Sequence, residues 1–333
     1  KSFTREGATL AEGTRRGESS GDRQVHRRSS AIQALATPKL HRIALRLAAA
    51  AAPGLAARLD PAPSEVAALA ARARPLTVPD DPEVVFLLPL VGRHHVDDWG
   101  AVSARLARTL ESFRRQTDPH WRALICGQDV PEGLPRDDRI RLLPFDEGVE
   151  GNDKWRKLAA LARALPGLGV AQGWAMPFDA DDLLAPGVVA EMRRRRVAAG
   201  YLVTQGLVHD AGAGLWARAR PRGLGAPGQK AFWKLCGSCA AFGFDLSTGR
   251  EDADLIAAIT AHEHRMFPYL ARLARRPLAA LSGDAALYIV NHGENFGKRR
   301  GRVSFKSRFV RRFALTDPAE IAAADAAFPD AAG

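Results

Sequence analysis

The strongest constraint on the fold is an almost unbroken apolar run at residues 84–91. A run of this length without polar alternation is typical of a strand buried on both faces, as in parallel sheets covered by helices. Helical spacing follows it, and strand and helix patterns then alternate at 121–126, 139–145, 154–165 and 174–178. This alternation predicts an α/β fold with an open, mostly parallel sheet flanked by helices.

The rest of the chain is less regular. Residues 1–38 are rich in Gly, Ser, Arg and Glu and predict a disordered extension, because they offer little apolar area to offset chain entropy. Residues 39–80 predict two short helices limited by prolines, and 81–297 predict the α/β domain. In its second half we expect strands at 201–208, 240–244 and 286–290, and a helix over 252–275 broken at Pro268. Residues 298–333 predict a basic helix and tail.

Three carboxylates, Asp179, Asp181 and Asp182, follow the apolar segment 174–178. Ligands of such sheets bind beyond the carboxyl ends of the strands, where Asp179 and Gly127 both fall. A cluster of like charges is costly unless a cation neutralises it, which points to a hard divalent metal carrying a phosphate-bearing substrate. The alternative is that these acids lie at a helix N-terminus, where they complement the helix dipole, and Asp182 fits that role best.

The charge balance allows further partners. The 333 residues carry a formal net charge of +11, and residues 298–312 hold eight basic residues and no acidic one. Phe305, Phe309 and Phe313 recur every four residues there, which predicts an amphipathic helix that either rests on anionic lipid or packs on the domain. A nucleic-acid-binding protein would explain the charge but not the carboxylates, so no specific nucleic acid is expected.

Cysteine content and hydropathy indicate the compartment. Three cysteines, Cys126, Cys236 and Cys239, are too few for a disulfide framework, so we expect a reducing, cytoplasmic location. The spacing of Cys236 and Cys239 is C-x-x-C, but no second pair completes a zinc site, and ordinary thiols are the favoured interpretation. No segment reaches the roughly 18 consecutive apolar residues of a membrane span, so any membrane contact would be peripheral, at the inner face.

Three segments together resemble a known family. Residues 83–90 (EVVFLLPL), 109–117 (TLESFRRQT) and 179–184 (DADDLL) resemble the first strand, the following helix and the D-x-D metal motif of family-two glycosyltransferases with the GT-A (Rossmann-like) fold. The resemblance covers residues 83–296. It implies a hexosyltransferase-like enzyme that uses Mn²⁺ or Mg²⁺ and a nucleotide-diphosphate sugar donor, with a glycan or lipid-linked acceptor. Many members carry Asp-Asp-Gly-Ser after the second strand, where this chain has Cys126-Gly127-Gln128-Asp129.

The resemblance also suggests site residues. The metal would be held by Asp179, Asp181 and His292, the last from the polar loop after the final strand. The alternative for His292 is a turn residue without a ligand role. Lys154 and Lys157 begin a helix, where the dipole disfavours cations unless an anion is near, although surface lysines are common on helices. The residues expected to contact the donor are Pro89, Gln128, Asp129, Lys154, Lys157 and Asp179.

A sugar transfer that inverts the anomeric centre needs a base to take the acceptor's proton. The candidates in the second half are Glu251, Asp252, Asp254 and Glu263, of which Glu263 and Asp252 are favoured as catalytic residues. The competing enzyme class is nucleotidyl transfer, which would be expected to show a glycine-rich phosphate loop after the first strand. Residues 91–94 contain one glycine, and neither a Walker loop nor a G-x-G-x-x-G after a strand occurs.

Overall fold

The computed structural model describes residues 33–77, 80–148, 151–292 and 303–331, which belong to one compact unit. Most of the predicted extension at 1–38 and the basic residues 298–302 lie outside the described residues. The predicted division at 80/81 and 297/298 stays a prediction.

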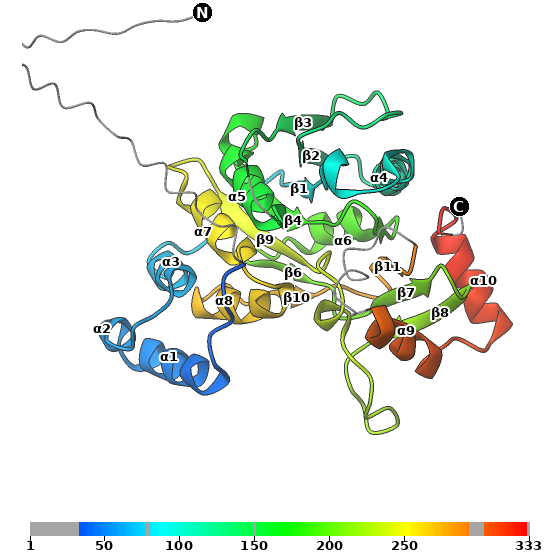
Figure 1. Cartoon of the computed structure of the whole chain (residues 1–333). Helices are drawn as coiled ribbons and strands as arrows, with labels where there is room; N and C mark the ends of the chain where they lie inside the picture. Colours follow the sequence, from blue (N-terminus) through cyan, green and yellow to red (C-terminus); the bar gives the residue numbers. More distant parts are fainter. Residues whose placement is uncertain (1–32, 78–79, 149–150, 293–302, 332–333) are drawn as a thin grey trace, which may run out of the picture. The chain divides into compact units, whose positions relative to one another are not determined.

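The central element is a seven-stranded sheet in the order β10-β6-β9-β4-β1-β2-β3 (Figure 1). Strands β4, β1, β2 and β3 are mutually parallel, and β9 runs antiparallel to both of its neighbours. The predicted α/β fold with a mostly parallel sheet is therefore confirmed. The strands are β1 (Glu83–Pro89), β2 (Trp121–Gly127), β3 (Ile140–Pro144), β4 (Gln172–Pro177), β6 (Gly200–Leu202), β9 (Ala240–Asp245) and β10 (Ala279–Ala280).

An aromatic cluster fixes the end of β4 against the sheet. Phe86 of β1 stacks on Phe113 with ring centroids 3.9 Å apart, and Phe178 meets Phe113 edge-on at 5.2 Å. Phe178 is fully buried and directly precedes Asp179. Because an aromatic side chain packed on several sides cannot shift without opening a cavity, the backbone that carries the carboxylates has a fixed origin.

Helices cover the sheet, and capping residues in the sequence help to set where they begin. The helix α4 (Trp99–Arg114) starts at Asp98, whose Oδ1 accepts a hydrogen bond from the Ala101 N–H at 2.8 Å. The helix α5 (Lys154–Ala164) packs on β1, β2 and α7 (Figure 1). The other helices of this part of the chain are α6 (Val188–Arg195), α7 (Glu251–Thr260) and α8 (Phe267–Leu273).

A second, four-stranded sheet has the order β5-β11-β7-β8. Its strands are β5 (Leu183–Leu184), β7 (Gly206–Asp210), β8 (Leu215–Ala219) and β11 (Ala286–Val290), and helices α9 (Val303–Arg312) and α10 (Pro318–Ala327) accompany it (Figure 1). Residues 178–182 connect β4 of the large sheet to β5 of the small one. The carboxylates therefore lie where the chain passes between the two sheets.

Three predicted elements differ from the structure. The strand expected at 201–208 is two strands, β6 and β7, in different sheets. The helix expected over 252–275 breaks at residues 261–266, and Pro268 lies in the first turn of α8, where its missing N–H is not needed. Residues 39–80 hold three helices rather than two, because Pro53 begins one of its own; they are α1 (Lys39–Ala51), α2 (Pro53–Ala57) and α3 (Pro63–Ala71).

The C-terminal helix α9 contacts β7, β8 and β11. Phe309 is buried and Phe313 is half-buried, whereas Phe305 is 39% exposed. Of the two alternatives for this helix, the structure thus shows the one in which its phenylalanines pack on the domain. No helix in the described part of the chain combines the length and apolar character needed to cross a membrane.

Candidate active site

A cavity of about 720 Å³ opens beyond the carboxyl ends of β1 and β4. Its lining includes Pro89 at the end of β1 and Leu90 after it, Asp179 and Asp181 after β4, and side chains from α5 and α9. A further wall comes from residues 230–237 and 263–265. The location agrees with the rule that ligands of open α/β sheets bind outside the carboxyl ends of the strands.

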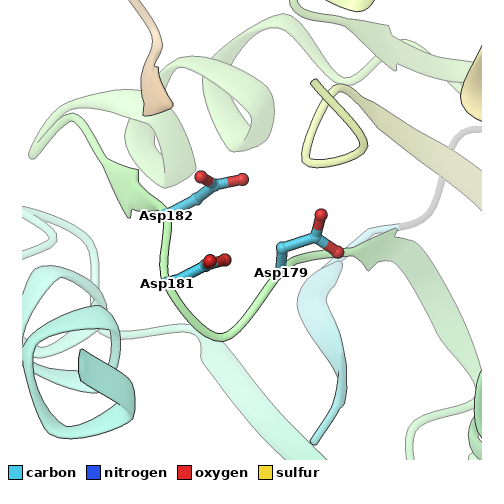
Figure 2. A group of neighbouring side chains, drawn as sticks. All are labelled: Asp179, Asp181 and Asp182. Atoms are coloured by element: carbon cyan, nitrogen blue, oxygen red, sulfur yellow. The ribbon is translucent and has the colours of Figure 1, made fainter. Parts of the chain in front are cut away.

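Asp179 and Asp181 line this cavity, and the Asp182 carboxylate lies close to theirs. One carboxylate oxygen from each lies within 4.8 Å of the others, and Figure 2 shows the three side chains carried by a single turn of the chain. The sequence hypothesis that Asp182 caps a helix is wrong, because the chain continues into β5 and α6 begins only at Val188. Asp182 is instead fully buried beside the other two carboxylates.

A loop after the small helix at residues 232–234 holds the carboxylates in place. The Ser238 hydroxyl accepts from the Asp179 N–H at 2.8 Å and donates to Asp182 Oδ2 at 2.6 Å. The Cys236 thiol donates to the same Oδ2 at 3.0 Å. A Cβ at Gly237 would lie 3.2 Å from Asp179 Oδ2, so a larger residue would crowd this carboxylate. The Cys-x-x-Cys segment thus positions the acidic cluster through hydrogen bonds.

The three acids have different electrostatic environments. Burial and the neighbouring charges of Asp181 and Asp179 raise the pKa of Asp182 well above its usual value. Burial also opposes ionisation of Asp181, but the hydrogen bond from His292 Nε2 at 2.8 Å, with the charges of His292 and Lys154, holds the pKa of Asp181 below its usual value. In the metal-free protein Asp182 therefore favours its protonated form, whereas Asp181 favours its ionised form.

The donor set fits a hard divalent cation. Asp182 Oδ1 is buried and has no hydrogen-bond partner among the described residues, although an isolated buried carboxylate oxygen is costly. Grouped carboxylates, two of which line the cavity, are ligands of the kind that Mg²⁺ and Mn²⁺ take in proteins. His292 lines the same cavity beside Asp181, where an imidazole nitrogen would suit Mn²⁺.

The cavity also has a cationic side. Lys154 Nζ lies 2.5 Å from Asp179 Oδ1, and although burial opposes its charge, the Asp179 carboxylate raises the pKa of Lys154. Lys306 of α9 lies over the Tyr288 ring at 4.3 Å. The remaining basic residues of the lining are Arg105, Lys230, Lys234 and Arg265. A cavity lined by both acidic and basic groups suits an anionic ligand that binds together with a metal ion.

The structure brings several predicted site residues together. Besides Asp179 and Asp181, the cavity is lined by Pro89, Lys154, His292 and Glu263. Glu263 comes from the turn between α7 and α8, far along the chain from the acidic cluster. Metal, donor and base candidates from five separate segments therefore share one cavity.

Four other predicted residues point elsewhere. Lys157 is fully buried, and its Nζ contacts Leu90 O at 2.5 Å, Gln128 Oε1 at 2.6 Å and Asp153 Oδ2 at 2.7 Å. Gln128 is thereby engaged with Lys157. The other two do not line the cavity either. Asp129 Oδ2 accepts from the Arg93 N–H at 2.8 Å, and Asp252 forms a buried ion pair with Arg276 at 2.9 Å and accepts from the Asp245 N–H.

Sequence reasoning missed Ser238, Cys236, His264 and Lys306 as site residues. The C-x-x-C spacing drew attention to the right segment, but for thiol chemistry rather than for its hydrogen bonds. His264 lines the cavity, and burial, with the charge of Lys154, lowers its pKa to about 4, so the imidazole is neutral near pH 7. Nothing in the local sequence shows that a residue of the basic tail lies opposite the carboxylates.

Comparisons with known proteins give weak similarity. No protein-family model and no curated protein matches the chain. Among solved structures, the chain is similar to S. aureus TarS, with a TM-score of 0.36 and 8% identity over 62% of this chain and 37% of that one. It is also similar to the mannosyltransferase PcManGT from Pyrobaculum calidifontis in complex with GDP-Man and Mn²⁺, with a TM-score of 0.34 and 18% identity over 79% of this chain and 71% of that one. The chain thus spans little more than a third of the first of these structures.

Proposed function

We propose that this chain is a metal-dependent glycosyltransferase that uses a nucleotide-diphosphate sugar. The observation that carries the proposal is the buried Asp182 with an unpartnered oxygen, grouped with Asp179 and Asp181 at the strand ends of an α/β sheet. The resemblance of residues 83–90, 109–117 and 179–184 to family-two glycosyltransferases supports the same conclusion. The acceptor would be a glycan or a lipid-linked precursor.

The residues divide the work of the transfer. Asp179, Asp181 and Asp182, with His292, would hold Mn²⁺ or Mg²⁺, which neutralises charge developing on the leaving diphosphate. Lys154 and Lys306 line the same cavity, and their ammonium groups would pair with phosphate oxygens of the donor. In an inverting transfer Glu263 removes the acceptor hydroxyl proton onto a carboxylate oxygen as the sugar carbon is attacked. His264, neutral at pH 7, offers a hydrogen bond to the bound sugar or acceptor.

The first test is ligand-dependent thermal stability. UDP-, GDP- and dTDP-sugars are screened with and without Mn²⁺, and the correct pair stabilises the folded protein by about 2.7 kcal/mol at a hundredfold excess over Kd. Asp181→Asn removes a metal ligand, so we expect it to abolish the Mn²⁺-dependent shift and to reduce transfer by about a thousandfold. Asp325→Asn, the same change on the exposed side of α10, is the matched control.

The products separate the proposal from its competitor. Glycosyl transfer releases a nucleoside diphosphate, whereas nucleotidyl transfer releases pyrophosphate from a nucleoside triphosphate. Release of pyrophosphate, or full activity in the Asp181→Asn protein, would show that the assignment is wrong.

A further inference from the structure

Helix α1 has two apolar faces on opposite sides. Successive helical residues are about 100° apart, so Leu45 and Ala49 point one way while Leu40, Ile43 and Leu47 point the other. Leu45 and Ala49 are fully buried, whereas Leu40, Ile43 and Leu47 are 82%, 52% and 67% exposed. An ordinary surface helix has one apolar face, so the second face needs an explanation.

The inward face fixes α1 to the body of the protein. Arg42 donates to Met266 Sδ at 3.4 Å, and its guanidinium lies over the Tyr269 ring at 5.5 Å. The Arg72 guanidinium donates to the Ala49 carbonyl at 2.5 Å and to the Leu273 carbonyl at 3.1 Å. Figure 1 shows α1 beside α8, which agrees with these contacts. The outward face is therefore held in a fixed orientation by the packing of the inward one.

The outward face combines apolar and cationic groups. Residues 39–59 contain four Lys or Arg residues and no acidic one. Lys39 and Arg46 are exposed along one border of the Leu40–Ile43–Leu47 stripe, and Leu55 and Arg58 of the neighbouring segment are also exposed. Single exposed apolar residues such as Val130 are normal, but three on one helix face form a continuous patch.

We propose that this face of α1 docks the protein on an anionic lipid surface. Apolar side chains bordered by Lys and Arg, without acids, are the composition that lies in the interface of an anionic bilayer. A nucleic acid would pair with the cations but would leave the leucines in water. The inference does not depend on the proposed transferase activity.

The experiment is cosedimentation of the full chain with phosphatidylcholine vesicles, with and without phosphatidylglycerol. We expect binding to the anionic vesicles that weakens as salt is added, because salt screens the attraction of Lys39 and Arg46. Leu40→Ser/Ile43→Ser/Leu47→Ser should weaken binding by at least about tenfold. Leu224→Ser, the same kind of change on a fully exposed loop residue, should leave it unchanged.

Two further measurements serve as controls for this experiment. Circular dichroism and thermal melting check that the triple variant is folded, which we expect because Leu45 and Ala49 are retained. Lys39→Gln/Arg46→Gln alters no apolar residue and should remove the preference for anionic vesicles. Wild-type binding by the triple variant would overturn the proposal and place lipid contact elsewhere, such as in the basic residues near the C-terminus. A dimer that the triple variant dissociates, without vesicle binding, would overturn it in favour of a second copy.

Discussion

Two buried ionisable groups lie near the same edge of the large sheet, and their partners differ. The Lys157 ammonium group contacts a carbonyl oxygen, an amide oxygen and a carboxylate, one partner for each of its three N–H donors. Asp182 has two donors on one oxygen and, among the described residues, none on the other, with two further carboxylates beside it. A buried ionisable group whose hydrogen-bond partners are all supplied by the protein stabilises the fold. A buried group with an incomplete set of partners indicates a place for a ligand.

The largest expected effect on stability comes from replacing Lys157, whose partners are complete. Lys157→Met leaves Asp153 buried without its cation, so we expect a loss of about 3–5 kcal/mol in the free energy of unfolding, measured by chemical denaturation. Lys154→Met is the matched change three residues away on the same helix. Because the Lys154–Asp179 pair is partly exposed, the loss should stay within about 1 kcal/mol while donor binding weakens. Equal losses of stability in the two variants would contradict the distinction between the groups.

An intermediate effect is expected at the loop that supports the acidic cluster. Ser238→Ala removes hydrogen bonds to Asp179 and Asp182 without removing a carboxylate. We expect the Kd for Mn²⁺ to rise roughly 10–100-fold, as for other residues that orient metal ligands, measured by calorimetry. Ser247→Ala, where the serine contacts Asp245 on an exposed loop, is the control. An unchanged Mn²⁺ affinity would mean that Ser238 does not position the cluster.

The smallest effect is a gain in stability. The raised pKa of Asp182 means that the folded, metal-free protein favours its protonated form, so stability falls as pH rises from the usual value of 3.8 through the raised pKa. Asp182→Asn removes this loss and should raise the free energy of unfolding by about 1 kcal/mol at neutral pH, with the gain vanishing in acid. Denaturation of both metal-free proteins across pH checks this. A variant that is less stable at neutral pH would show that the carboxylates do not repel one another there.

Much of the fold could be predicted because periodicity is a local property. The apolar runs at β1, β2, β4 and β11 have the length and composition of buried strands, and the structure has a strand at each. The split of residues 201–208 could not be predicted, because β6 and β7 differ in which sheet they join and not in their composition. Gly206 marks the junction: a Cβ there would lie 2.4 Å from the Phe232 ring, a contact between segments distant in sequence.

The candidate site divides in the same way. Asp179 and Asp181 were found because their spacing after a strand is visible in the chain. Lys154 and Lys157 carry the same local signal, and only packing separates the one that lines the cavity from the one enclosed within the protein. Glu263 and Asp252 were equal candidates for the base, and the Arg276 ion pair accounts for Asp252.

The sequence by itself determined that the chain forms a mostly parallel α/β sheet and that carboxylates follow one of its strands, because strand burial and the alternation of strands with helices are visible in local apolar patterns. The tertiary structure alone decided which charges are neutralised. Ser238 and His292 bond to the carboxylates, and Lys306 lines the same cavity, from segments 56 to 127 residues away along the chain, counted from Asp182 to Ser238 and from Asp179 to Lys306. Neutralisation depends on distance in space and on exclusion of water, and neither is a property of a short stretch of sequence.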